Sequence, residues 1–250
     1  MDVMRFPTLQ QVRRRLRRPR NGIVIGGCAR SGTTLLLSVL SSHPEICAIP
    51  QETQIFCPTA YDPKPTSHAA IRPNLVDEYL PDRRSSTGCK YWCEKTPKNV
   101  RFFGRLIKEL TRRIKLIHIV RDGRDVVVSR HPKRPDDYWV SPKRWIEDVT
   151  LGREVEHHAR VLTIRYEDLV LNFKATAEVI GHFLQLGETS AFHDFPAKAT
   201  IQKSEAWSSA IRPLDSGSIG RWKADEFTDR VDELMQDDRA VELLRHYHYL

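Results

Sequence analysis

Short apolar runs alternate with helix-like segments along most of the chain. The apolar runs predict strands at Ile23–Gly26, Ile46–Ile49, Tyr91–Glu94, Lys115–Val120 and Val161–Arg165. The segments between and after them predict helices at Thr33–Ser42, Asn99–Arg112, Asp125–Arg130, Pro142–His157, Phe173–Leu184 and from about Glu226 to Tyr247. Strands that alternate with helices are typical of a parallel sheet with helices packed on both faces. The pattern therefore predicts an α/β fold with a central, mostly parallel sheet.

Two proline-rich segments interrupt this alternation, at residues 57–88 and at residues 131–142. Long irregular segments in compact domains tend to be functional covers or disordered loops. We interpret both segments as candidate walls of a substrate site, with ordinary surface loops as the alternative.

The length and composition of the chain fit one soluble globular domain. Its 250 residues, of which 40% are hydrophobic, are enough to bury one substantial core. The net charge of +8 comes mostly from residues 1–20, which contain seven arginines and one acidic residue. We expect residues 1–20 to form a flexible basic arm, either solvated or in contact with anionic lipid or an acidic partner. Residues 21–250 then form a nearly neutral domain, which lacks the basic surface of a nucleic-acid-binding protein.

Neither a membrane span nor a metal or disulfide framework is indicated by the residue pattern. No apolar run approaches the roughly 18–20 residues of a span, and the basic N-terminus is not followed by a signal-peptide core, so we expect a cytoplasmic protein. The five cysteines are an odd number, and Cys89 and Cys93 lack a second pair or neighbouring histidines. Cys28 is expected to be a small buried thiol rather than a nucleophile.

A glycine-rich loop, "GGCARSGTT", follows the first predicted strand and precedes the first predicted helix. Gly27 and Gly32 match the glycines of the phosphate-binding signature G-x-x-x-x-G-K-[ST], but Thr33 stands at the lysine position. Backbone N–H groups and the helix dipole make such a turn an anion site. The guanidinium of Arg30 can bind a terminal anionic group through two hydrogen bonds without a metal, and Thr33 and Thr34 add hydroxyl donors.

A second segment, "KLIHIVRDGRDVVVSR", predicts another anion site. It reads as a strand that ends before Arg121, then a turn and a short helix that carries Ser129. Ligands of open α/β sheets bind beyond the carboxyl ends of the strands, so this site is expected beside the glycine-rich loop.

The two motifs together resemble the paired 5′-phosphosulfate and 3′-phosphate motifs of sulfotransferases that use 3′-phosphoadenosine 5′-phosphosulfate (PAPS). The segments "HPEICAIPQET", "EKTPKN", "IRYEDLV" and "IRPLDSGSIGRW" extend the resemblance from Ile23 to about Trp222. Among these enzymes the chain looks most similar to the branch with tyrosylprotein sulfotransferases and related bacterial enzymes. The resemblance implies a P-loop-type three-layer α/β/α fold.

The resemblance also implies a role for individual residues. Arg30, Ser31, Gly32, Thr33 and Thr34 would hold the 5′-phosphosulfate, Arg121 and Ser129 the 3′-phosphate, and Tyr166 and the backbone around Arg212 other parts of the nucleotide. Glu52 matches the catalytic base and Lys95 a lysine near the transferred sulfuryl group. Histidines that could replace Glu52 as base have plainer interpretations: His43 as a helix cap, His118 as a core residue, and His157 and His158 as the end of a helix.

The implied reaction is in-line transfer of a sulfuryl group to a hydroxyl acceptor, with release of adenosine 3′,5′-bisphosphate and without a metal. The acceptor could be a sugar, a lipid, a phenol or a peptide. Gln54 stands where the tyrosylprotein enzymes have an arginine that helps to bind acidic peptide, which argues against peptidyl tyrosine. The alternatives are a P-loop kinase-like phosphotransferase, with Asp122 as a metal ligand, and a non-catalytic nucleotide-binding module.

Overall fold

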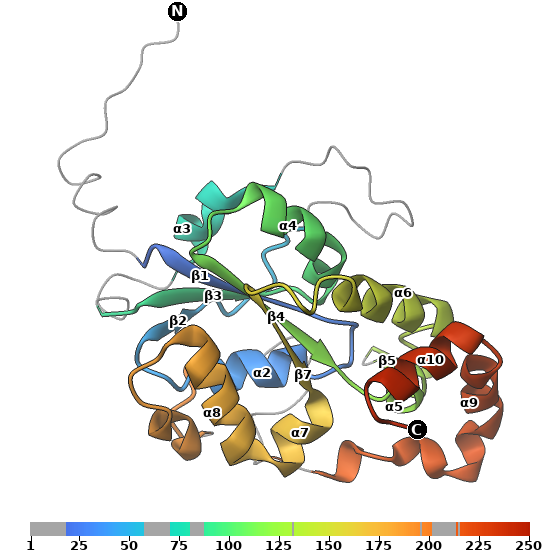
Figure 1. Ribbon diagram of the computed structural model, residues 1–250. Coiled ribbons are helices and arrows are strands. Elements are labelled where there is room, and N and C mark those ends of the chain that lie inside the picture. Colours follow the sequence, from blue (N-terminus) through green and yellow to red (C-terminus); the bar gives the residue numbers. More distant parts are fainter. Residues whose placement is uncertain are drawn as a thin grey trace, which may run out of the picture.

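The computed structural model describes residues 19–57, 71–80, 88–131, 133–195, 197–201, 214 and 216–250. Its centre is a parallel sheet of five strands in the order β2-β3-β1-β4-β7, and helices cover both faces (Figure 1). The strands are β1 (Asn21–Gly26), β2 (Ile46–Ala48), β3 (Tyr91–Lys95), β4 (Ile114–Val120) and β7 (Val161–Arg165). The prediction of a three-layer α/β fold is confirmed.

The helices form a layer on each side of this sheet. On one face lie α2 (Thr33–Leu40), α7 (Tyr166–Leu171) and α8 (Phe173–Leu184), and on the other α3 (Val76–Tyr79) and α4 (Phe103–Glu109) (Figure 1). Beyond α4, α6 (Pro142–Arg153) packs with α5 (Gly123–Val127), α9 (Thr228–Met235) and α10 (Asp238–His246). Short 3₁₀ turns lie at Pro73–Leu75, Pro97–Phe102, Ser190–Asp194, Ser216–Ser218, Arg221–Lys223 and Asp225–Phe227.

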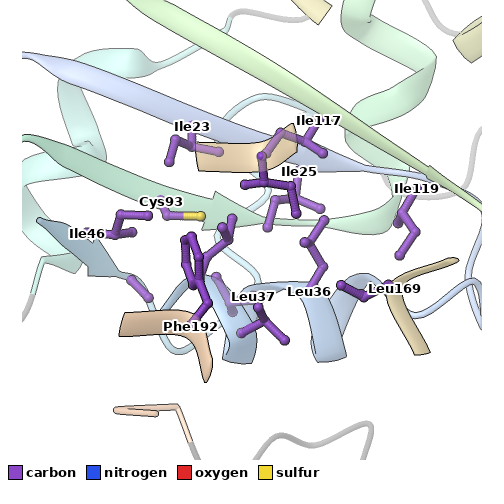
Figure 2. Close-up of a cluster of buried hydrophobic side chains, with 14 of the residues drawn as sticks. Ile23, Ile25, Leu36, Leu37, Ile46, Cys93, Ile117, Ile119, Leu169 and Phe192 are labelled. Carbon is purple, nitrogen blue, oxygen red and sulfur yellow. The ribbon is translucent and has the colours of Figure 1, made fainter. Parts of the chain in front are cut away.

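The central strand β1 is buried on both faces, which explains its unbroken apolar sequence. Ile23 and Ile25 pack against Leu36 and Leu37 of α2 (Figure 2). Val24 points to the opposite face, where it joins the cluster that contains Phe103 of α4. A third cluster, which includes Trp145, lies where α5, α6, α9 and α10 meet.

The structure differs from the predicted elements mainly at their ends. The expected helix Asn99–Arg112 is a 3₁₀ turn followed by α4, and the expected C-terminal helix is divided into α9 and α10. The division has a local cause, because the Asp237 carboxylate accepts a hydrogen bond from the backbone N–H of Arg239 and caps a new helix.

Part of the segment 131–142 belongs to a short antiparallel strand pair, with a register shift between Arg130 and His131, rather than to an irregular loop. Strands β5 (Arg130–His131) and β6 (Arg134–Tyr138) pair antiparallel, and the His131 ring stacks on Trp139 with 4.2 Å between ring centroids. Proline is compatible with such a two-stranded edge, so the prolines did not exclude strands here. Of the other segment, residues 58–70 and 81–87 lie outside the described residues.

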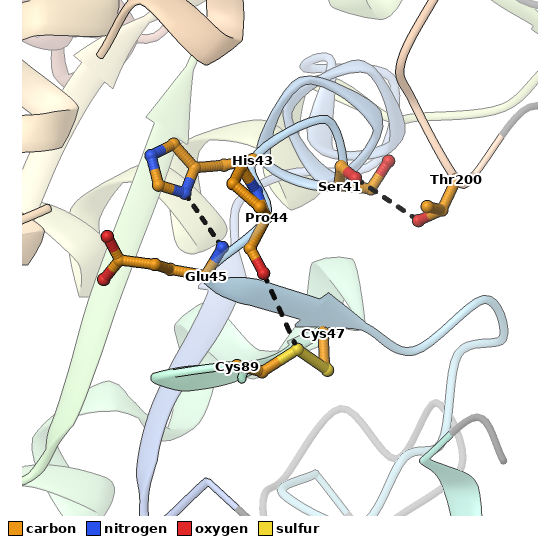
Figure 3. The surroundings of a disulfide bond; sticks show 7 residues. All are labelled: Ser41, His43, Pro44, Glu45, Cys47, Cys89 and Thr200. Atoms are coloured by element: carbon orange, nitrogen blue, oxygen red, sulfur yellow. Dashed lines mark hydrogen bonds between the residues drawn. A yellow bond between two sulfur atoms is a disulfide. The ribbon is translucent and has the colours of Figure 1, made fainter. Parts of the chain in front are cut away.

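A disulfide joins Cys47 of β2 to Cys89, so the indication against disulfides is wrong for this pair (Figure 3). The two residues are 42 positions apart, and their Cα atoms are 5.8 Å apart. They meet because β2 and β3 are neighbours in parallel register, with Cys47 opposite Trp92. Such a disulfide is more usual in oxidising compartments than in the cytoplasm.

Cys28, Cys57 and Cys93 are free and buried, and burial raises the pKa of the Cys28 thiol well above its ordinary value. A thiol held protonated is a poor nucleophile, so the interpretation of Cys28 as a small buried group is confirmed.

Within the described ranges, every helix is too short or too polar to traverse a lipid bilayer. Residues 1–18 of the expected arm, and Arg212, fall outside those ranges.

Candidate active site

The residues singled out in the sequence gather at one edge of the sheet. Because the five strands run parallel, their carboxyl ends share that edge. The glycine-rich loop follows β1, Glu52 follows β2, Lys95 ends β3, Arg121 follows β4 and Tyr166 follows β7. The register places Lys95 beside Ile25 at the end of β1, and Arg165 beside Val120 at the end of β4. The topology therefore brings five separate segments to one place.

The glycine-rich loop is tightly enclosed by β4 and Tyr166. A Cβ atom on Gly27 would lie 2.4 Å from the carbonyl oxygen of Ile119, and one on Gly32 would lie 2.4 Å from Cδ2 of Tyr166. Gly32 has a φ of +91°, and Arg30 has a left-handed φ of 70°. Space therefore requires a glycine at both positions, and at Gly32 the left-handed backbone conformation requires it as well.

Substituting Gly32→Ala is expected to destabilise the fold by about 1–3 kcal/mol, because the new Cβ meets Tyr166 and the left-handed φ disfavours a side chain. The measurement is the melting temperature. The matched control is Gly104→Ala in α4, where a Cβ would meet only Val155 Cγ1 at 3.9 Å. That change is expected to be neutral or stabilising, as alanine favours helix. Equal melting temperatures for the two variants would contradict the account of the loop.

Several polar atoms of the loop and of the neighbouring Arg121 are buried and lack a hydrogen-bond partner among the described residues. Nε of Arg30, Oγ of Ser31 and Nε of Arg121 make no hydrogen bond within the part of the chain that the structure describes. Buried polar atoms are normally satisfied, so unpaired donors in two neighbouring segments indicate a site for a ligand. Thr33 and Thr34 are buried at the start of α2, whose first turn contains no acidic residue.

Positive charge is concentrated around these atoms. Burial lowers the pKa of the Arg30 guanidinium, and the neighbouring cations Arg121 and Arg221 lower it further. An anion among these arginines would relieve both the desolvation and the mutual repulsion. The loop therefore has the charge and the unpaired donors of an anion site.

Arg121 connects the second motif to the first. Its Nη1 donates to the carbonyl oxygen of Arg30 at 3.1 Å, and its Nη2 donates to the carbonyl oxygen of Ser218. The guanidinium lies 4.5 Å from the centre of the Tyr166 ring, and the Tyr166 hydroxyl is 2.7 Å from Oγ of Ser218. Ser129, on the other end of α5, donates to the carbonyl oxygen of Asp125 at 2.9 Å.

Asp125 and Ser218 belong to this region although no role was predicted for either. The buried Asp125 carboxylate accepts hydrogen bonds from the backbone N–H groups of Gly220 at 2.8 Å and Trp222 at 3.1 Å. It thereby fastens the segment 216–222 over α5, and the Trp222 ring packs against Arg124 at 3.9 Å. The segment "DSGSIGRW" was recognised in the sequence, but these contacts depend on the tertiary structure.

Glu52 and Lys95 form an ion pair on the other side of the loop. The Lys95 side chain is 3% exposed, whereas that of Glu52 is 43% exposed. The ammonium group therefore lies inside the site, and the carboxylate lies at its surface, within reach of a molecule that arrives from solvent.

Two of the histidines considered as alternatives to Glu52, His118 and His43, are buried away from the Glu52–Lys95 pair. His118 is fully buried and burial lowers its pKa to about 3, so the ring is neutral at physiological pH. His43 accepts from the backbone N–H of Glu45 at 3.1 Å and contacts the carbonyl oxygen of Glu188 at 2.7 Å, so it ties two loops together, whereas the C-cap of α2 is Ser41.

Comparison with known proteins identifies the family. The family model "Sulfotransferase domain" matches residues 20–243. Among solved structures, the sulfotransferase domain of the Synechococcus PCC 7002 olefin synthase is 18% identical, with a TM-score of 0.62 over 94% of this chain and 96% of that one. The sulfotransferase domain from the curacin biosynthetic pathway is 15% identical, with a TM-score of 0.65 over 94% and 99%.

Mouse sulfotransferase SULT7A1, solved in complex with PAP, is 17% identical, with a TM-score of 0.51 over 92% of this chain and 89% of that one. No curated protein sequence matches the chain. At these identities the solved structures show the fold, and the family model covers most of the chain. The chain therefore belongs to the sulfotransferase domain family, and its reaction class is sulfuryl transfer.

Proposed function

We propose that the chain transfers a sulfuryl group from PAPS to a hydroxyl acceptor and releases adenosine 3′,5′-bisphosphate. The observation that carries this proposal is the contact between the two predicted anion-binding motifs, in which Arg121 donates a hydrogen bond to the Arg30 carbonyl oxygen. A donor with a phosphosulfate at one end and a 3′-phosphate at the other needs two such sites. The mouse relative with the same fold was solved with PAP, which supports a nucleotide of this kind.

The residues present fit such a donor. The 5′-phosphosulfate would be held by Arg30, Ser31, Gly32, Thr33 and Thr34, and the 3′-phosphate by Arg121 and Ser129. The support comes from the buried, unpaired Nε atoms of Arg30 and Arg121 and from Oγ of Ser31, which lack partners among the described residues. Tyr166 lies against the guanidinium of Arg121 and would contact the nucleotide.

The bound donor supplies the sulfuryl group. The half-exposed Glu52 carboxylate accepts the proton of the acceptor hydroxyl, whose oxygen forms a bond to sulfur as the bond between sulfur and the phosphate oxygen breaks. The buried ammonium of Lys95 and the guanidinium of Arg30 stabilise negative charge on the sulfuryl and bridging oxygens. Most of the catalysis is then positioning and electrostatics.

Calorimetry with adenosine 3′,5′-bisphosphate, in buffer that contains EDTA, tests the donor. We expect binding in the micromolar range, and no binding at these concentrations would refute the PAPS assignment. Binding of ATP that depends on Mg²⁺ would instead support the kinase-like alternative. Transfer of the labelled sulfuryl group from PAPS, either to water as free sulfate or to a panel of sugars, phenols, lipids and peptides as their sulfate esters, then separates an enzyme from a binding module.

A further inference from the structure

A fully buried carboxylate, Glu94, lies next to Lys95 in β3 and has no part in the proposed reaction. Its Oε1 accepts hydrogen bonds from the backbone N–H of Thr53 at 3.2 Å, from Oγ1 of Thr53 at 3.0 Å and from Oγ1 of Thr96 at 2.6 Å. Its Oε2 accepts from Nδ2 of Asn99 at 2.7 Å. Burial raises the pKa of Glu94, and these hydrogen bonds oppose the rise.

Two of these hydrogen bonds come from Thr53, the residue directly after Glu52. The next residue, Gln54, has a left-handed φ of 55°, which is unfavourable for a residue with a side chain. Its backbone N–H donates to Oγ1 of Thr96 at 3.4 Å. A strained turn persists only where neighbouring groups hold it. Here those groups are Glu94 and Thr96, whose hydroxyl donates a hydrogen bond to Glu94.

The same network reaches the glycine-rich loop. Nδ2 of Asn99 donates to the carbonyl oxygen of Ile25 at 3.0 Å as well as to Glu94. The backbone N–H of Gly27 donates to the carbonyl oxygen of Pro97 at 3.0 Å. One buried carboxylate thus ties the turn after β2 to the strand that ends in Lys95 and, through Asn99, to Ile25 near the end of β1, directly before the glycine-rich loop.

We propose that Glu94 is a positioning residue that fixes the Glu52 turn opposite Lys95 and the glycine-rich loop. This inference rests on the proposed function, because it assumes that Glu52 is the base. A displacement of about 1 Å can cost about 10²-fold in rate, so a network that holds the turn is important even though Glu94 touches no substrate. Thr53 is the main link, since it supplies both a backbone and a side-chain donor.

Two isosteric substitutions and their combination test the proposal. Glu94→Gln is expected to lower kcat for donor turnover about 10²-fold, and Thr53→Val about 10-fold, with the affinity for adenosine 3′,5′-bisphosphate within about two-fold of wild type. The double variant is expected to resemble Glu94→Gln alone, because both changes break one network. Turnover is followed as sulfate released from PAPS to water, which requires no identified acceptor.

Hydrogen exchange gives a second readout that does not depend on activity. Glu94→Gln is expected to speed amide exchange in residues 52–55 and to leave α8 unchanged. The matched control for Thr53→Val is Thr163→Val in β7, where the buried hydroxyl has no hydrogen-bond partner within the described ranges. This control is expected to leave kcat, nucleotide affinity and exchange in residues 52–55 unchanged.

The results separate the failure of this inference from failure of the proposed function. Unchanged exchange in residues 52–55 of Glu94→Gln would overturn the positioning role. So would a loss of kcat accompanied by an equal loss of nucleotide affinity, which indicates a general structural role. A wild-type chain that neither binds nor turns over PAPS would refute the proposed function, and with it the role of the turn in transfer.

Discussion

Replacing Glu52 with glutamine is expected to lower sulfuryl transfer about 10²–10⁴-fold, the usual contribution of a general base. Glutamine keeps the size of the side chain but cannot accept the acceptor's proton. The affinity for adenosine 3′,5′-bisphosphate should stay within about two-fold, because that product lacks the sulfuryl group and Glu52 contacts Lys95 rather than the arginine cluster. Turnover of labelled PAPS and calorimetry measure the two quantities.

The chain offers a matched control for this change. The partly buried Glu45 pairs at 4.0 Å with Lys90, which lies just before the amino end of β3. Glu45→Gln therefore removes a similar carboxylate outside the site. Its turnover is expected to equal that of the wild type. If Glu52→Gln retained full turnover, another group would have to serve as base.

Replacing Arg121 with alanine is expected to weaken binding of adenosine 3′,5′-bisphosphate about 100-fold. A hydrogen bond to a charged group contributes about 1.5–3 kcal/mol, and this guanidinium would make such a bond to the 3′-phosphate. Calorimetry with adenosine 5′-phosphate, which lacks the 3′-phosphate, should show a much smaller loss. The difference between the two nucleotides isolates the contribution of the 3′-phosphate.

This comparison also controls for structural damage. Arg121 donates to the carbonyl oxygens of Arg30 and Ser218, so its removal can loosen the loop and the segment 216–222. Damage of that kind would weaken both nucleotides equally, and such a result would contradict a direct contact with the 3′-phosphate. Arg153→Ala, which removes an exposed ion pair with Glu242, should bind both nucleotides as the wild type does.

The sheet could be predicted from the sequence because strands that are buried on both faces are apolar at nearly every position. Residues such as Ile23, Val24 and Ile25 are all apolar since each faces a helix layer, and the parallel order then places the strand ends together. The prediction that the glycine-rich loop and Arg121 are neighbours therefore depended only on topology. Their roles in binding remain predictions.

Features that depend on register or on single hydrogen bonds could not be read from the sequence. The Cys47–Cys89 disulfide requires the alignment of β2 with β3, which the spacing of 42 residues does not reveal. Asp125 and Glu94 accept hydrogen bonds from backbone N–H groups that are distant in the sequence. Because almost every residue has a backbone N–H group, the sequence does not show which of them will bind a carboxylate. Acidic residues near a motif are equally common on solvated surfaces.

The short strand β2 has a consequence for how the protein would respond to heat. This strand has three residues and lies at the edge of the sheet, so few ladder hydrogen bonds hold the turn that carries Glu52. The disulfide at Cys47 and the hydrogen bonds from Thr53 to Glu94 also hold this turn in place. The free energy of opening this turn can be much smaller than that of global unfolding. The fraction of molecules with Glu52 beside Lys95 would then decline at temperatures where the core is still intact.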